Sequence, residues 1–149
     1  MWRSDLARVC SKLKDINIIN KKSHYEKDII SLLPIDKYTF VNDTFYDVLY
    51  DGCVKMEFKK QTGGQWFDLK KLSKLPQDHL STHIVFFCFG KSTDIRVCSY
   101  SDILAYFDSH LSSTWREWAV QAPQRCQIKY QISQRDIKAV APSIVDVRA

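Results

Sequence analysis

The stretch that decides the fold is YDVLYDGCVKMEFKKQ, residues 46–61. Asp51-Gly52 is a strong turn signal, and apolar and polar residues alternate on both sides of it, as in two antiparallel strands. A two-residue loop places Tyr46 opposite Glu57. A three-residue loop ending at Cys53 places Asp47 opposite Glu57 and separates an apolar face from a charged one. Because alternation strongly specifies which side of a strand is buried, we prefer the three-residue loop.

The charged face of this hairpin carries Asp47, Lys55, Glu57 and Lys59. Two carboxylates opposite each other on paired strands repel, at a cost of roughly 0.2–1 kcal/mol, and a divalent cation between them reverses the sign of that interaction. Mg²⁺ prefers two such carboxylates with water and phosphate oxygens. Lys59 could orient or deprotonate a water, or stabilise negative charge on a phosphate. The arrangement therefore suits metal-assisted attack of water on a phosphodiester.

The rest of the chain reads as helices alternating with short strands. Apolar periodicity and caps predict helices over residues 2–16, 23–34, 65–75, 99–111 and 114–120. β-rich runs predict strands over residues 37–42, 44–50, 53–61, 83–89, 94–100 and 127–133. The run HIVFFCF is continuously apolar, which indicates a strand covered on both faces. This order predicts an α/β or α+β fold with a central mixed sheet that contains an antiparallel hairpin and is flanked by helices.

Length and composition limit the class of protein. A chain of 149 residues with 45% hydrophobic and 26% charged residues is expected to form a single globular domain. We divide residues 1–149 into an N-terminal helix (1–20), a core (23–108) and a C-terminal extension (112–149). A net charge of +5 permits a polyanionic partner without requiring one.

The cysteines and the absence of certain motifs limit the cellular compartment, the partners and the cofactors that we expect. Five widely spaced cysteines without a CxxC pair argue against a disulfide framework or a zinc site, and fit a reducing intracellular compartment such as cytoplasm or nucleus. No apolar run approaches the roughly 20 residues that span a bilayer, so we expect no membrane partner. No phosphate loop is present, so we expect no nucleotide cofactor.

The pattern of Asp47 followed ten residues later by Glu57-Phe58-Lys59 resembles the PD-(D/E)XK nucleases. Its spacing is similar to that of small phage and archaeal Holliday-junction resolvases. The resemblance covers residues 23–100, where a helix, three antiparallel strands, a helix and a further strand follow the order of a restriction-endonuclease-like core. Tyr46 stands where the motif has its proline.

The resemblance implies a Mg²⁺- or Mn²⁺-dependent endonuclease that acts on DNA, favours branched or junction DNA and forms a homodimer. Asp47 and Glu57 would be metal ligands, the backbone carbonyl of Phe58 a further ligand, and Lys59 the catalytic lysine. Glu26 matches a glutamate that many members add from the first core helix. Ser23-x-x-Glu26 is also a capping box, so both roles remain open for Glu26.

Basic and polar residues near this motif are candidates for contact with nucleic acid: Lys55, Lys60, Gln61, Lys70 and Lys74. Helical spacing places the last two lysines on one face, which could follow a phosphate backbone. Three tryptophans, Trp66, Trp115 and Trp118, could stack on unpaired bases, although such residues are more often core or dimer contacts.

Other interpretations compete with the nuclease reading. The charged face of the hairpin could be a solvated strand face with cross-strand salt bridges. The protein could also be a restriction-type enzyme, a non-catalytic nucleic-acid-binding module or a protein-binding domain.

Overall fold

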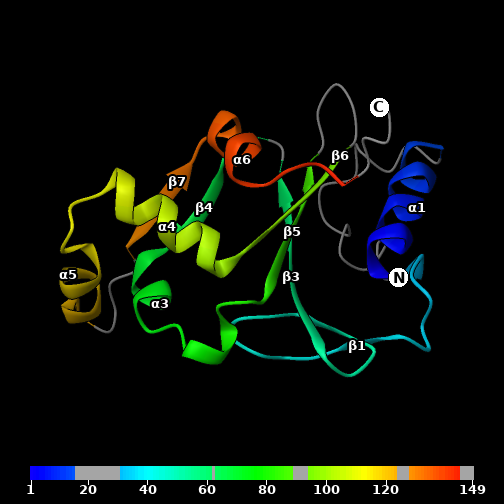
Figure 1. Ribbon diagram of the computed structural model, residues 1–149, viewed down its shortest axis with the longest axis horizontal. Coiled ribbons are helices and arrows are strands. Elements are labelled where there is room, and N and C mark those ends of the chain that lie inside the picture. The colour runs from blue at the N-terminus through cyan, green and yellow to red at the C-terminus, as the bar shows by residue number, and fades with distance from the viewer. Residues whose placement is uncertain (16–30, 62, 89–93, 124–127, 145–149) are drawn as a thin grey trace.

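A computed structural model describes residues 1–15, 31–61, 63–88, 94–123 and 128–144. Its centre is a five-stranded sheet in the order β1-β2-β3-β5-β6 (Figure 1). The strands are β1 (Tyr38–Phe40), β2 (Val48–Tyr50), β3 (Val54–Gln61), β5 (His83–Cys88) and β6 (Asp94–Ser99). β3 and β5 pair in parallel, and the other three pairings are antiparallel. The predicted mixed sheet with an antiparallel hairpin is therefore confirmed.

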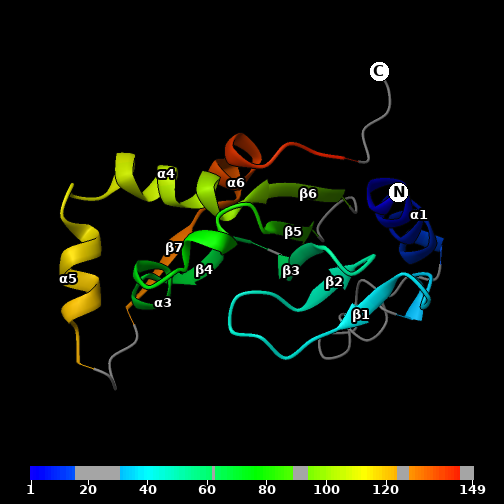
Figure 2. The same ribbon diagram turned by 60° about the horizontal axis from the view of Figure 1, so that its bottom comes forward.

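Helices cover both faces of this sheet. On one face α1 (Trp2–Asp15) packs against the sheet through Leu6, Val9 and Cys10, and on the other face lie α3 (Leu69–Ser73) and α4 (Tyr100–His110). In the turned view α1 and α5 (Trp115–Gln121) lie at opposite ends of the molecule (Figure 2).

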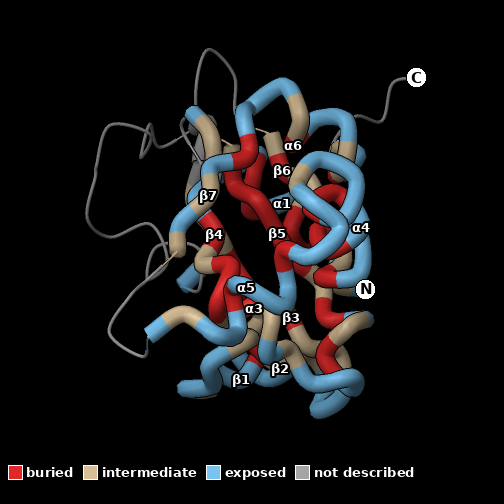
Figure 3. Tube along the Cα trace, turned by 90° about the vertical axis from the view of Figure 1, so that its left-hand side faces the viewer, coloured by how far each residue is buried: buried red, intermediate tan, exposed pale blue. Residues whose placement is uncertain are grey.

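Strand β5 separates two hydrophobic clusters. Val85 and Phe87 belong to the cluster that contains α1, whereas Ile84 and Phe86 belong to the cluster beneath α3 and α4. All four side chains are at most 1% exposed, and Figure 3 shows the strand in the buried interior. The prediction that this apolar run is covered on both faces is confirmed.

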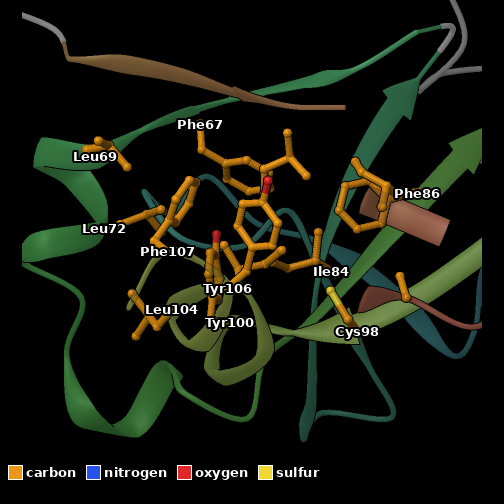
Figure 4. Close-up of a cluster of buried hydrophobic side chains, with 14 of the residues drawn as sticks. Phe67, Leu69, Leu72, Ile84, Phe86, Cys98, Tyr100, Leu104, Tyr106 and Phe107 are labelled. Carbon is orange, nitrogen blue, oxygen red and sulfur yellow. The ribbon is translucent and has the colours of Figure 1, made fainter. Parts of the chain in front are cut away.

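The second cluster extends beyond the sheet toward the C-terminal part of the chain. Figure 4 shows Phe67, Phe86, Tyr100 and Phe107 gathered in it. Trp115, which is fully buried, packs against Phe107 with ring centroids 5.7 Å apart. The core interpretation is therefore correct for Trp115.

A separate two-stranded sheet forms one wall of this cluster. It pairs β4 (Gln65–Asp68) with β7 (Lys129–Ile132) in antiparallel fashion. The prediction of one helix over residues 65–75 is thus wrong in its first half. Asp68 ends the strand and caps α3, accepting a hydrogen bond from the Lys70 N–H. A Cβ on Gly64 would lie 2.7 Å from the Ile132 carbonyl oxygen, so this glycine permits a close approach of the two backbones.

The remaining helices begin at serine caps or near the expected positions. Ser99 and Asp102 form a capping box at α4. The short helix α5 matches its prediction, but α6 (Gln134–Val140), capped by Ser133, falls in residues for which we predicted no element. The connection from β3 to β5 also contains a 3₁₀ turn, Gln77–His79.

The described part of the chain adds two observations on its setting. Its four cysteines, Cys10, Cys53, Cys88 and Cys98, form no disulfide with one another. Among the helices within the described ranges, none is long and apolar enough to cross a bilayer.

Candidate functional site

The hairpin has the register that places the acidic side chains together. Tyr50 pairs with Val54, so the loop is the three residues 51–53, and both Asp51 and Gly52 have positive φ angles of 53° and 72°. The ladder continues to Val48 opposite Met56. Asp47 lies one residue beyond the ladder, and its N–H donates to the Met56 carbonyl oxygen at 2.9 Å. The predicted loop is confirmed, although Asp47 itself is outside the regular pairing.

The Asp47 side chain contacts β3. Its Oδ2 accepts a hydrogen bond from the Phe58 N–H at 3.1 Å, and it also hydrogen-bonds the Glu57 side chain. The two carboxyl groups that the sequence placed on one face therefore meet.

Glu57 is buried, with 8% of its surface exposed. It pairs with Ile84 in β5, a member of the second cluster, so its side chain emerges on the side of the sheet that faces α3 and α4. Burial, followed by the hydrogen bond with Asp47, raises the pKa of Glu57 from 4.5 to about 8, against the opposing charges of Lys59 and Lys71. At neutral pH Glu57 is thus mostly protonated. A solvated strand face is the wrong description of this position.

Lys59 completes the group. Its Nζ lies 3.8 Å from Glu57 Oε2 and 5.1 Å from the centre of the Phe67 ring. It pairs with Phe86 two positions along from Ile84, so it shares the face of Glu57. Sequence alternation thus brought Asp47, Glu57 and Lys59 to one place, as predicted.

Aromatic residues hold the segment that leads into Asp47. The Tyr100 hydroxyl donates to the Phe45 carbonyl oxygen at 2.7 Å. The ring of His79 packs against both Phe45 and Tyr46, with centroid distances of 5.4 and 5.6 Å. Because both His79 and Tyr100 are buried, these contacts anchor the segment to the protein interior. Sequence analysis assigned them no role, since no local pattern connects residues 79 and 100 with residue 47.

The predicted nucleic-acid contacts are dispersed. Lys55 forms an ion pair with Asp78 at 3.7 Å. Lys60 pairs with Phe87 and thus lies on the opposite face from Lys59. Lys70 is only 9% exposed, so it does not form the expected exposed stripe with Lys74, which is exposed.

Three further predicted residues are not placed as ligands or contacts by the structure. Glu26 lies outside the described residues, and so does the side chain of Gln61. Phe58 packs its ring against Phe87 at 5.1 Å, while its carbonyl as a metal ligand stays a prediction.

The donor set fits a magnesium-type ion rather than a closed metal centre. Within the ranges described, there is no group of three or more His, Cys, Asp or Glu side chains that could enclose a metal. Mg²⁺ usually takes only one or two carboxylates and keeps water and substrate phosphate as its other ligands. Asp47 and Glu57 supply two adjacent carboxyl groups, and Glu57 would have to lose its proton to join Asp47 as a ligand of a divalent cation.

No protein-family model and no curated protein sequence matches this chain. The functional conclusion therefore depends on the geometry of the site.

Proposed function

We propose that this protein is a metal-dependent endonuclease that hydrolyses DNA phosphodiester bonds, with branched or junction DNA as its preferred substrate. The observation that carries the proposal is the carboxyl pair of half-buried Asp47 and buried Glu57, with the Lys59 ammonium 3.8 Å from Glu57. A structural salt bridge would not need a second acid beside Glu57. Two acids and one lysine on one face match the roles that the PD-(D/E)XK resemblance implies.

The order of elements gives independent support. Three antiparallel strands, β1 to β3, are followed by the additional strand β4, by α3 and then by β5. Apart from β4, which pairs outside the central sheet, this is the order that the resemblance implies after the first core helix. The site lies at the middle of the sheet, where β3 contacts both β2 and β5. Strands paired on both sides hold their side chains more rigidly than loops do, as a catalytic site requires.

Each residue has a chemical task in the proposed reaction. Asp47 and Glu57 would hold Mg²⁺ or Mn²⁺, and Glu57 must lose its proton to do so. When bound, such an ion supplies a more acidic water and neutralises charge on the phosphate. Lys59 directs its ammonium toward the same position, where it stabilises negative charge that builds up on the phosphate oxygens. A homodimer would allow both strands to be cut.

Cleavage of labelled DNA tests this proposal. Single-stranded, duplex and four-way-junction DNA of matched sequence is incubated with the protein in Mn²⁺, in Mg²⁺ or in EDTA. We expect metal-dependent cuts, fastest in the junction. Lys59→Ala and Glu57→Gln should each lower the rate at least 100-fold, while DNA binding in EDTA persists. Lys12→Ala, which removes an exposed lysine from α1 on the other side of the sheet, should cut like the wild type.

Two outcomes would overturn the proposal. If the wild type binds DNA with ordinary salt dependence but never cuts it, the protein is a non-catalytic binding module. If it cuts and the Lys59 and Glu57 variants cut equally well, the site lies elsewhere. Equal rates on duplex and junction would retain a nuclease but favour a restriction-type substrate.

A further inference from the structure

A basic cavity of about 190 Å³ adjoins the carboxyl pair. It lies between β4, α3 and the first residue of α4. Lys59, whose Nζ is 3.8 Å from Glu57, lines it, so the cavity is directly adjacent to the proposed catalytic residues. Lys71, from α3, and Lys129, from β7, line it too. Sequence reasoning missed Lys129. It reaches the cavity only because β7 pairs with β4, which brings Lys129 opposite Asp68.

The charge of the cavity favours an anion. Three lysines face one acid, Asp68, whose carboxylate is already engaged as the cap of α3. Within the described part of the chain, neither Lys71 nor Lys129 forms an ion pair. Lys71 instead lies 5.5 Å from the ring of Phe45. Lys71 is half-buried and Lys129 is exposed, so both ammonium groups are accessible to a phosphate group that enters the cavity, where they can form charge-assisted hydrogen bonds with it.

The size and lining of the cavity favour part of a nucleotide. Its volume is below the roughly 300–1,000 Å³ of pockets that enclose a whole drug-sized ligand. Its floor is apolar, formed by Phe67, Leu72 and Tyr100. Trp66 also lines it, and 53% of that residue remains exposed. A large aromatic residue beside lysines is the combination by which proteins bind unpaired strands, with bases stacked on rings and phosphates on cations.

We propose that this cavity binds the phosphate of an unpaired nucleotide next to the scissile bond, with Lys71 and Lys129 as its cations and Trp66 as the surface for the adjoining base. The inference rests on the proposed nuclease function and specifies its substrate as DNA with a single-stranded segment at the cut. Bases stacked within an intact duplex present no open face to Trp66. The preference for branched DNA would then arise from the unpaired nucleotides at a branch point.

Equilibrium binding in EDTA tests this inference without requiring cleavage. Fluorescence anisotropy is measured for a labelled thymidine decanucleotide and for a ten-base-pair duplex over a range of salt concentrations. The wild type should bind the single strand more tightly. Trp66→Ala should weaken single-strand binding about 5- to 150-fold, the loss expected for one stacked base, and leave duplex binding unchanged. Trp66→Phe should restore most of the affinity.

The lysines give a second, independent readout. The slope of log K against log salt is negative, and each phosphate contact of a single strand contributes about 0.7 to its magnitude. Replacing both Lys71 and Lys129 by alanine should therefore reduce that magnitude by about 1.4. Lys12→Ala should leave the slope unchanged. The thermal unfolding of each variant verifies that it is folded.

The results that would overturn the inference differ from those that would overturn the nuclease. Equal loss of single-strand and duplex binding in Trp66→Ala, no loss at all, or an unchanged salt slope in the double lysine variant would each exclude the cavity as a nucleotide site. Any of these could occur in an active nuclease. Conversely, single-strand binding through Trp66 without metal-dependent cleavage would retain the cavity and reject the nuclease.

Discussion

Replacing Glu57 by glutamine should remove a pH dependence of stability that the wild type shows in the absence of metal. The pKa of Glu57 is raised to about 8 in the folded protein and lies near 4.5 in the unfolded chain. Between these values the folded state binds more protons, so the free energy of unfolding falls as pH rises. The stabilisation is complete below pH 4.5 and is lost as the pH passes through 8.

The magnitude follows from the two pKa values. Each pKa unit corresponds to about 1.4 kcal/mol, so the loss of stability between pH 4.5 and 8 is on the order of 4–5 kcal/mol. This is a large share of the 5–15 kcal/mol typical of a native domain. Glutamine at position 57 carries no charge and can donate the hydrogen bond to Asp47 that the protonated glutamate makes. The variant should therefore be the more stable protein at pH 9 and close to the wild type at pH 5.

Urea denaturation from pH 5 to 9 in EDTA measures the effect for both proteins. The difference between them isolates Glu57 from other titrating groups such as His83, whose pKa burial lowers and whose contribution has the opposite slope. Saturating Mn²⁺ should restore the wild type at pH 9, because a ligand that binds only the folded state stabilises it. Wild-type and variant curves that run parallel across this range would refute the reasoning.

The support for the site yields two smaller effects, each measurable by urea denaturation at constant pH. Tyr100→Phe removes the hydrogen bond to the Phe45 carbonyl oxygen and should lower the free energy of unfolding by about 0.5–1.5 kcal/mol. Because Tyr100 holds the segment that leads to Asp47, the same variant should also bind Mn²⁺ more weakly. An unchanged Mn²⁺ affinity would contradict that role. Ser99→Ala removes the capping box of α4 and should lower the free energy of unfolding by about 0.5–2 kcal/mol. The control is Ser101→Ala, two residues further along α4 and exposed, which should lower it by less than about 0.5 kcal/mol. Equal losses in the two variants would contradict the cap assignment.

The hairpin could be predicted because its turn and its strand register are determined by residues that are close together in the sequence. Alternation sorts Val54, Met56 and Phe58 from Lys55, Glu57 and Lys59, and the turn signal at Asp51-Gly52 fixes where the chain reverses. A one-residue slip would exchange the two faces. Three of the candidate residues therefore meet as the alternation predicts, even though Asp47 lies just outside the ladder.

The parts that sequence reasoning missed depend on contacts between distant segments. Trp66, Leu69 and Leu72 have helical spacing, yet Trp66 lies in a strand because β7, more than 60 residues later, pairs with β4. That pairing also brings Lys129 to the basic cavity and explains why a side chain at Gly64 would collide with Ile132. Lys70 was expected on an exposed face, but α3 packs against α5 and the second cluster, so its side chain is buried.

The central claim of this account is that Asp47 and Glu57 share one divalent cation. Calorimetric titration of Mn²⁺ into the metal-free protein at pH 7, repeated in two buffers of different ionisation enthalpy, tests it most directly. We predict one ion per chain, bound with release of about one proton from Glu57, and loss of that binding in Asp47→Asn and Glu57→Gln but not in Lys12→Ala. Absence of binding to the wild type, or equal binding and proton release in the Asp47 and Glu57 variants, would contradict the account.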